Sequence, residues 1–467
     1  MNPQAAALLA SLEPWSASPG DGWTRLRGLL EKHADSDFGR HHGFDAIRSP
    51  VDFRAAIPPM DFEAHRSWIE RAAAGEKQVL ACDEPIGFER TSGTSSRAKW
   101  IPLTTGLQEE FARGLAAWFG GWKRRCPEVF AGRGYWAISP PGMAPETTSG
   151  GLPVGMTSDA AYFPSEIGRK LAEWLVVPGL SGGTVFEETA EALLGAPDLS
   201  VVSVWSPTFL LGIDAEVRRQ CGGRNWREIW PKLALVSCWA DASSAPWIPQ
   251  LRERLGGIPI EAKGLLATEG ITSVPDAIDG RPRLASECHW HEFLDDAGQF
   301  TETSDLQLGR IYEVLLTTGG GLFRYRSGDR VRVTGVGADG LPRLRFVGRA
   351  GNLSDLVGEK LHEDQVWDAL AGCGFLVADR ERPGYDLWLE DVTRAAEMET
   401  SLRRNPYFHQ ALALRQLSPL VVRRLPDDWC VRLIGALARH RGCRLGDVKP
   451  PVLLTRETVA EVASWLG

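Results

Sequence analysis

Apolar and polar positions along this chain follow two alternating repeats. Apolar residues recur at helical spacing over residues 106–125 and 165–175, which predicts two amphipathic helices. Between such segments stand short, nearly continuous apolar runs that predict buried strands. Alternation of strands and helices indicates an α/β fold with a largely parallel or mixed sheet. The predicted strands cover residues 135–139, 200–205, 233–239 and 258–267.

The pattern changes from Arg310 onward, where apolar strands are separated by turns. This predicts an antiparallel region that closes a large domain. The glycine-punctuated segment from Gly348 to Gly358 predicts a domain boundary, so we expect a large domain at 1–349 and a small α/β domain of about a hundred residues at 350–467. In the small domain we expect helices at 363–371, 392–404, 428–441 and 456–466, and strands at 386–390 and 419–424.

Composition narrows the possible partners. The 467 residues are 43% hydrophobic and carry 52 basic and 60 acidic side chains, a net charge of −8. Nucleic-acid binding depends on neutralising many phosphates, so we expect no nucleic-acid partner. The first residues do not read as a signal peptide, and no window approaches ~18 uncharged apolar residues, so no membrane partner is expected. The eight cysteines are scattered without a C-x-x-C pair, which predicts a reduced, cytoplasmic protein.

The segment from Thr91 to Lys99, T-S-G-T-S-S-R-A-K, contains five hydroxyls, a glycine and two cations. Hydroxyls and backbone N–H groups donate to phosphate oxygens, Gly93 allows close approach, and Arg97 and Lys99 supply countercharge. The segment therefore predicts a polyphosphate loop. An ordinary solvated turn is the alternative.

Three further clusters have the chemistry that an ATP-using enzyme needs. In G-L-L-A-T-E-G, Glu269 follows an apolar strand and could hold Mg²⁺, although a Thr–Glu helix cap is an alternative. In F-R-Y-R-S-G-D, Asp329 could accept the ribose hydroxyls of a nucleotide, although Ser-Gly-Asp is also typical of a hairpin turn. Lys449 stands in the proline-stiffened loop G-D-V-K-P-P-V, where by itself it would be a solvated charge.

Taken together, these clusters resemble the adenylate-forming enzymes, and more closely the GH3 acyl acid–amido synthetases. The resemblance rests on T-S-G-T-S-S-R-A-K-W-I-P-L, A-T-E-G, G-L-F-R-Y-R-S-G-D-R-V-R-V-T-G, R-F-V-G-R, V-G-E-K-L and the terminal K-P-P. It spans roughly Phe88 to the C-terminus. It implies an adenylating α/β fold with mixed sheets in a large N-terminal domain and a small mobile C-terminal domain.

The resemblance also implies roles for individual residues. Glu269 would hold Mg²⁺, Asp329 and Arg349 would bind the ribose, and Lys449 would reach the adenylate as the main catalytic lysine. Lys99 would join it at the triphosphate, and Lys360 would be a second small-domain lysine at the nucleotide. The triphosphate would also contact Thr91, Ser92, Gly93, Thr94 and Ser95, while Ala267 and Thr268 would flank the adenine and α-phosphate.

The implied reaction uses ATP and Mg²⁺ to convert a carboxylic acid to an acyl-adenylate, which then reacts with an amine, typically an amino acid. Transfer to coenzyme A or a carrier-protein thiol is the alternative. One departure from the family pattern is Ser96, which stands where a second glycine is usual in the phosphate loop. The expected assembly is a monomer or a weak homodimer.

Three remaining features have weaker chemical readings. Trp136, Trp205, Trp239 and Ser139 lie at or beside predicted strands and are candidates for the acyl pocket, where aromatic rings suit a flat or apolar acid. The His289-Trp290-His291 pair lacks a nearby third ligand and favours a sheet face over a metal site. The pentapeptide around Ser181, G-L-S-G-G, matches a serine-hydrolase elbow, but no histidine partner is identified for it.

Overall fold

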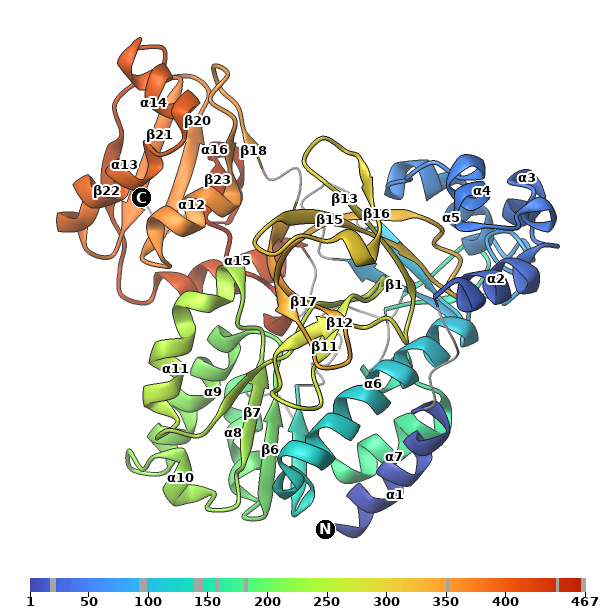
Figure 1. The fold of residues 1–467 in the computed structure, drawn as a ribbon. Helices are drawn as coiled ribbons and strands as arrows, with labels where there is room; N and C mark the ends of the chain where they lie inside the picture. Colours follow the sequence, from blue (N-terminus) through green and yellow to red (C-terminus); the bar gives the residue numbers. More distant parts are fainter. Residues whose placement is uncertain are drawn as a thin grey trace.

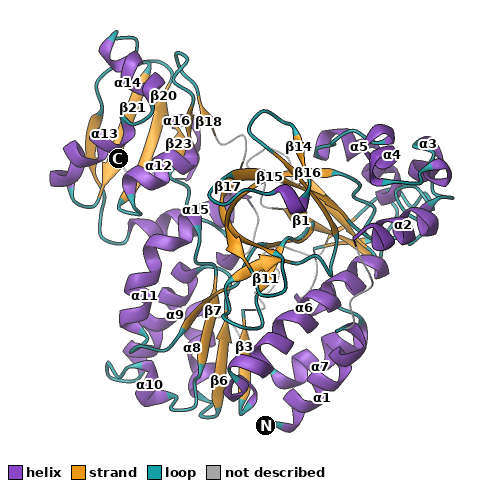
Figure 2. Cartoon of the chain, viewed as in Figure 1, coloured by secondary structure: helices purple, strands orange, loops and turns teal. Residues whose placement is uncertain are grey.

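A computed structural model describes residues 1–16, 22–91, 99–137, 146–155, 159–179, 184–349, 353–441 and 445–462. The chain forms an N-terminal body of helices and sheets and a C-terminal unit that lies against one side of it (Figure 1). Both parts mix helices and strands, as the α/β pattern predicts (Figure 2).

A parallel sheet forms one half of the N-terminal body. Its strands lie in the order β3-β6-β7-β8 and all pair in parallel. Each is short and mostly buried because helices cover both faces. The strands are β3 (Arg133–Trp136), β6 (Leu199–Ser203), β7 (Leu235–Cys238) and β8 (Ile260–Ala262).

The two faces of this sheet have separate cores. Trp136, Val201 and Leu235 pack with helices α1, α6 and α7 on one face, while Val202 and Val236 pack with α8 to α11 on the other. Figure 1 shows these two helical layers on either side of β6 and β7. The helices are α1 (Pro3–Leu12), α6 (Thr105–Arg125), α7 (Ser165–Trp174), α8 (Val185–Leu194), α9 (Pro207–Gln220), α10 (Trp226–Ile229) and α11 (Ile248–Arg254).

The predicted strand at 258–267 is wrong in one respect, because the chain turns within it. β8 ends at Ala262, and a separate strand, β9 (Leu266–Ala267), pairs antiparallel with β10 (Gly270–Ile271). Gly264 between them has φ +89, and a Cβ there would lie 2.4 Å from the Ser273 carbonyl oxygen. This left-handed turn is a backbone constraint that the apolar pattern does not reveal.

The antiparallel region lies beside the parallel sheet, as predicted, and begins before Arg310. Its strand order is β11-β12-β17-β16-β15-β13-β14. Leu316, Val331 and Leu344 contribute to its core. The strands are β11 (Ser273–Pro275), β12 (Pro282–Leu284), β13 (Trp290–Leu294), β14 (Phe300–Thr301), β15 (Ile311–Thr317), β16 (Tyr325–Val336) and β17 (Pro342–Arg349).

A smaller sheet carries the Thr91–Lys99 segment. β1 (Gly87–Thr91) pairs antiparallel with β2 (Lys99–Leu103), and the sheet continues through β5 (Pro153–Val154) to β4 (Glu146–Thr147). Phe88 and Ile101 pack beneath N-terminal helices whose apolar faces share one core with Phe323. These helices are α2 (Gly22–His33), α3 (Asp37–His41), α4 (Pro50–Ala56) and α5 (Phe62–Ala73).

The C-terminal unit has its own sheet, in the order β22-β21-β20-β23. The expected helices and strands are found, and β20, β23 and α14 were not foreseen. A short β18–β19 pair (Leu353–Ser354 and Leu361–His362) precedes the sheet. The sheet strands are β20 (Gly374–Asp379), β21 (Gly384–Leu389), β22 (Val421–Arg424) and β23 (Leu453–Thr455), and the helices are α12 (Glu363–Leu370), α13 (Ala395–Leu402), α14 (Pro406–Ala413), α15 (Trp429–Arg441) and α16 (Arg456–Val462).

Candidate active site

Lys449 brings the C-terminal unit into contact with the N-terminal sheets. It follows the short helix η8 (Leu445–Asp447), and its Nζ lies 4.3 Å from the centroid of the Phe346 ring and 4.6 Å from that of Trp239. Burial lowers the pKa of the Lys449 ammonium to about 8, while the Asp329 carboxylate opposes the shift. The lysine is therefore placed against β7 and β17 with a charge that titrates just above neutrality.

Asp329 and Arg349 form an ion pair beside Lys449. They face each other across β16 and β17, and Arg349 Nε donates to Asp329 Oδ1 at 2.8 Å. Burial would raise the pKa of Asp329, but Arg349 and Lys449 outweigh it and hold that pKa below its usual value. The carboxylate is thus ionised, and it also accepts from the Ser327 hydroxyl at 3.0 Å.

A bulge in β16 sets the position of Asp329. Arg326 and Arg330 of β16 pair with Leu315 and Glu313 of β15. Residues 327–329 lie between the two arginines, but only Val314 lies between their partners. Gly328 within this bulge has φ +84. The hairpin-turn alternative for Ser-Gly-Asp is therefore wrong, because these residues lie inside a long strand. Bulges of this kind re-aim a side chain next to functional sites.

Thr268 and Glu269 form the tight turn between β9 and β10, since Ala267 pairs with Gly270. The helix-cap alternative is thus also wrong. Glu269 is only 4% exposed, and it accepts a hydrogen bond from the Thr268 hydroxyl at 2.9 Å. The Asp329 carboxylate is the main cause of the raised pKa of Arg349, and the Glu269 carboxylate raises that pKa further. Glu269, Arg349, Asp329 and Lys449 therefore form one electrostatic cluster.

The two histidines of H-W-H hold the Glu269 turn from behind. His289 Nε2 accepts the Ile271 backbone N–H at 2.9 Å, and His291 Nε2 donates to the Ile271 carbonyl at 3.0 Å. Since Nε2 of His289 is an acceptor, its Nδ1–H donates to Glu110 on α6, at 2.9 Å. The sequence shows the alternating histidines, but Glu110, the partner of His289, lies 179 residues away.

The structure describes only the two ends of the predicted phosphate loop, Thr91 and Lys99. Thr91 pairs with Lys99 where β1 and β2 meet the loop, and Lys99 Nζ lies 5.6 Å from the centroid of the Phe62 ring. Residues 92–98 lie outside the described residues, and they include Ser92, Gly93, Thr94, Ser95, Ser96 and Arg97. Ser139 and Ser181 also lie outside them.

Lys360 stands apart from this cluster. It is exposed, has φ +43 and immediately precedes β19. Its carbonyl accepts from Asn405 Nδ2 at 3.3 Å, a bond that orders the backbone. Among the described residues, the contacts that join Lys449, Asp329 and Arg349 do not include Lys360.

The candidate pocket tryptophans form a row that ends at Lys449. Trp136 and Trp205 have ring centroids 6.3 Å apart, and Trp205 and Trp239 have centroids 5.6 Å apart. A residue that the sequence reasoning missed, Lys263, places its Nζ 4.1 Å from the Trp205 centroid and 5.2 Å from that of Trp136. It follows β8, where its sequence context, E-A-K-G, carries no recognisable motif.

Within the part of the chain that the structure describes, no group of three His, Cys, Asp or Glu side chains could hold a metal ion. One buried carboxylate such as Glu269 nevertheless suits Mg²⁺, which binds through one or two carboxylates together with substrate phosphates. No helix among the described residues has the length and apolar character needed to span a bilayer.

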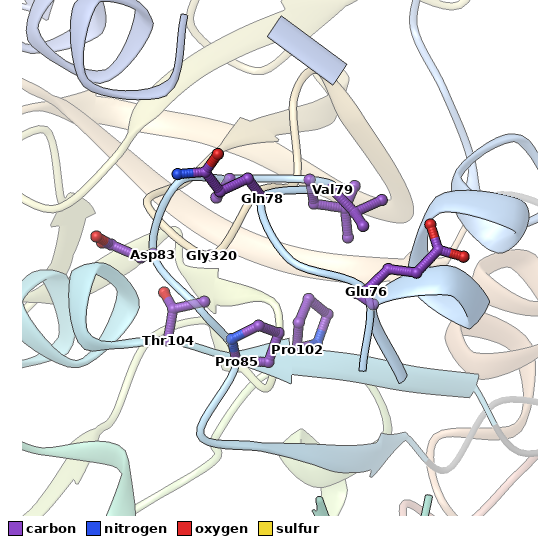
Figure 3. Close-up of a pocket in the computed structure, with 11 residues that line it drawn as sticks. Glu76, Gln78, Val79, Asp83, Pro85, Pro102, Thr104 and Gly320 are labelled. Atoms are coloured by element: carbon purple, nitrogen blue, oxygen red, sulfur yellow. The ribbon is translucent and has the colours of Figure 1, made fainter. Parts of the chain in front are cut away.

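A separate pocket lies near the loop that precedes β1 (Figure 3). Its lining includes Glu76, Val79, Asp83, Pro102 and Thr104. None of the predicted site residues that the structure describes lines it. Its lining, as far as the structure describes it, contains the carboxylates of Glu76 and Asp83 and no Lys or Arg side chain that could bind a phosphate. We therefore place the candidate site at Lys449 and not here.

Two parts of the chain match the models of a known protein family. Residues 24–180 match the GH3 family N-terminal domain, and residues 284–349 match the GH3 family central domain. The second match ends at Arg349 and includes Asp329. A probable indole-3-acetic acid-amido synthetase, GH3.1 of Arabidopsis thaliana, is 24% identical over 533 residues, covering 94% of this chain and 89% of the relative.

A second relative is a putative indole-3-acetic acid-amido synthetase, GH3.10 of Oryza sativa subsp. japonica, 24% identical over 392 residues, covering 74% of this chain and 81% of the relative. Among solved structures, an AtGH3.15 acyl acid amido synthetase in complex with 2,4-DB matches with a TM-score of 0.80 at 18% identity, covering 98% of this chain and 96% of that one. A 2-hydroxyisobutyryl-CoA ligase matches with a TM-score of 0.60 at 15% identity, covering 95% of this chain and 90% of the ligase. The chain therefore has the α/β adenylating fold of these structures, and its N-terminal and central parts match the GH3 family models.

Proposed function

We propose that this protein is an ATP-dependent acyl acid–amido synthetase. The observation that carries the proposal is the docking of Lys449, from the C-terminal unit, beside the Asp329–Arg349 ion pair and Glu269. The matches to the two GH3 domains and the amido synthetase names of the relatives support it. The acid and the amine are small molecules, and the amine is an amino acid.

The first half-reaction joins two anions. A carboxylate oxygen of the acid attacks the α-phosphorus of ATP, the bond to the β-phosphate oxygen breaks, and pyrophosphate leaves. Lys449, protonated at pH 7 with a pKa of about 8, offsets the repulsion and stabilises charge on the phosphoryl oxygens. In the second half-reaction the amine attacks the acyl carbonyl, loses a proton and expels AMP.

Nucleotide binding is assigned to residues around this lysine and, on the family resemblance, to Lys99, Lys360 and residues 91–95. Asp329 and Arg349 bind the ribose, Ala267 and Thr268 flank the adenine and the α-phosphate, and Lys99 reaches the triphosphate. The remaining triphosphate contacts come from Thr91, Ser92, Gly93, Thr94 and Ser95, and Lys360 is the second small-domain lysine. Mg²⁺, when bound, neutralises phosphate charge, and Glu269 is the residue that would hold it.

We further propose that the chain divides near residue 350 and that the small domain moves between half-reactions. The free cysteines among the described residues are consistent with a reducing, cytoplasmic setting. A monomer or weak homodimer remains our expectation for the assembly.

ATP–pyrophosphate exchange tests the first half-reaction. Exchange should depend on added carboxylic acid across a broad panel, and mass spectrometry with pooled amino acids should then detect an amide and AMP. If no acid supports exchange, the protein does not form adenylates.

Acyl transfer to coenzyme A is the second candidate, favoured by the structural likeness to 2-hydroxyisobutyryl-CoA ligase. Amino acids, coenzyme A and a carrier protein should be compared for their effect on AMP release. Stimulation by a thiol and not by any amine would replace amide synthesis with thioester synthesis.

A further inference from the structure

Buried polar atoms without partners gather on one face of the parallel sheet. Trp136, Ser203 and Ser237 lie in one register row across β3, β6 and β7, so their side chains point to the same face. They are 4%, 2% and 0% exposed. The Trp136 indole N–H and both hydroxyls have no hydrogen-bond partner within the described ranges of the chain. Because buried polar groups in native proteins are almost always satisfied, these three point to a ligand.

A neighbouring serine shows what a satisfied side chain looks like on the same strand. The Ser200 hydroxyl donates to the Val129 carbonyl at 2.7 Å and accepts the Gly132 N–H at 3.1 Å. Ser200 is as buried as Ser203 and Ser237. The missing partners are therefore a property of the row and not of buried serines in this sheet.

Lys263 adds a positive charge to this row. The row continues from Ser237 to Glu261 on β8, and Lys263 follows two residues later on the same face. Its side chain is fully buried, and its Nζ faces the Trp205 ring at 4.1 Å and the Trp136 ring at 5.2 Å. Cation–π contacts stabilise an ammonium at this depth, and in a low-dielectric interior it attracts an anionic oxygen strongly.

The row reaches the carboxyl ends of parallel strands, where α/β sheets bind ligands. Trp205 and Trp239 stand between the two lysines, with ring centroids 5.6 Å apart and Lys449 Nζ 4.6 Å from Trp239. An elongated molecule that passes these rings would have Lys449 at one end and Lys263 at the other.

We propose that Trp136, Ser203, Ser237 and Lys263 form the far end of the acyl-acid site and select acids with a second anionic oxygen group remote from the reacting carboxylate. This inference rests on the proposed function, which places the reacting carboxylate near Lys449. The hydroxyls and the indole N–H donate to that second group, and Lys263 neutralises it. An acid with an apolar tail would leave these donors unpaired, so the proposed acid differs from the flat or apolar acid that the tryptophans suggest.

Matched acids test the proposal in two assays. The probes are hexanoate and hexanedioate, octanoate and octanedioate, and benzoate and benzene-1,4-dicarboxylate. Calorimetry measures their binding to the full chain with AMP, and pyrophosphate exchange measures their activation. We expect at least one dicarboxylate to bind and exchange on the order of 10- to 100-fold better than its monocarboxylate, the range for a charged hydrogen bond.

Single substitutions then test which residues cause the dicarboxylate preference. Lys263→Met should remove most of this dicarboxylate preference, and Ser203→Ala and Ser237→Ala should each reduce it without lowering the melting temperature, since neither hydroxyl bonds to the described protein. Ser200→Ala is the matched control: it should lower the melting temperature and leave the preference unchanged. If Lys263→Met does not fold, the two serine variants carry the test alone.

The outcomes separate the two proposals. Equal or better binding of every monocarboxylate, or no binding of any acid, overturns the dicarboxylate site, as does a preference that survives the Lys263 and serine substitutions. Dicarboxylate binding that depends on Lys263 without pyrophosphate exchange would instead retain the site and contradict the proposed function.

Discussion

Lys449 is the residue whose environment most directly predicts chemistry. Two aromatic rings, Trp239 and Phe346, flank its ammonium, and Asp329 and Arg349 lie close enough to influence its charge. Under the proposed function its contribution to catalysis would be electrostatic, because its ammonium would offset the repulsion between two anions that must meet.

We expect Lys449→Ala to lower acid-dependent pyrophosphate exchange by a factor of order 10² to 10³, about 3 kcal/mol, the usual cost of removing one such group. ATP binding by calorimetry should change little, because Asp329 and Arg349 remain. Lys232→Ala removes an exposed lysine and serves as the control. Exchange that is unchanged in Lys449→Ala would remove this lysine from the mechanism.

The same lysine predicts a pH dependence. Its pKa of about 8 means that the ammonium is present below that pH and is lost as pH rises through it. The kcat/KM for exchange should therefore fall above pH about 8. In Lys449→Arg the guanidinium stays protonated, so the residual kcat/KM for exchange should not fall above pH about 8. An unchanged alkaline limb in Lys449→Arg would assign the limb to another group.

At the scale of elements, the β9–β10 hairpin presents Glu269, and it is held by contacts that lie behind it. His289 links Ile271 on β10 to Glu110 on α6, and a Cβ at Gly114 on α6 would lie 2.4 Å from Ile271 Cδ1. The position of Glu269 therefore depends on close packing of α6 against the hairpin.

We expect His289→Leu to reduce the free energy of unfolding by about 1–3 kcal/mol, because the Ile271 N–H and the Glu110 carboxylate lose a partner. It should also raise the Mg²⁺ concentration for half-maximal exchange by about tenfold, since outer residues orient metal ligands. His33→Leu is the control: His33 is equally buried and accepts the Cys82 N–H, but it lies away from the hairpin. An equal Mg²⁺ shift in both variants would make His289 merely structural.

At the scale of the whole molecule, the C-terminal unit docks through contacts other than Lys449. Trp429 on α15 has its ring centroid 6.4 Å from that of Trp247 in η5 (Ala242–Trp247). Gly372, at φ +82, follows α12, and a Cβ there would lie 2.2 Å from Pro246 Cβ. If the small domain moves as proposed, Lys449 would reach the N-terminal sheets only while this interface is closed.

Gly372→Ala should therefore slow acid-dependent exchange by tenfold or more, because a penalty of about 1.4 kcal/mol on the docked state changes the docked-to-undocked ratio tenfold. ATP affinity should be retained. Gly340→Ala is the matched control, since Gly340 has φ +80 and no atom within 4 Å of its added Cβ. If both variants lose exchange equally, backbone strain and not docking is responsible.

The sequence predicted most of the fold, and it did so where local pattern is sufficient. Apolar runs located β6 and β7, and periodicity located α6 and α7 to within a residue or so. It failed at Gly264, where a left-handed turn divides one apolar run into β8 and β9. The short strand β23 was missed because its pairing with β20 lies far away in the chain.

The sequence likewise predicted only some of the residues of the candidate site. Motifs identified Lys449, Asp329, Arg349 and Glu269, which the structure brings together. The local alternatives for the Asp329 and Glu269 motifs, a hairpin turn and a helix cap, were wrong because strand pairing decides both. No sequence motif marks Lys263 or Glu110. Their place in the site is apparent only from their contacts with Trp205 and His289, which lie elsewhere in the chain.

By itself the sequence determined the fold class, the order of the motifs and the residue types that we propose handle ATP, because these follow from local periodicity and from side-chain chemistry. Only the tertiary structure decided which residues share a charge environment, which polar atoms are buried without partners, and how Lys449 meets Asp329. Burial and contact between distant segments depend on how sheets and units pack, and chain order alone does not specify that packing.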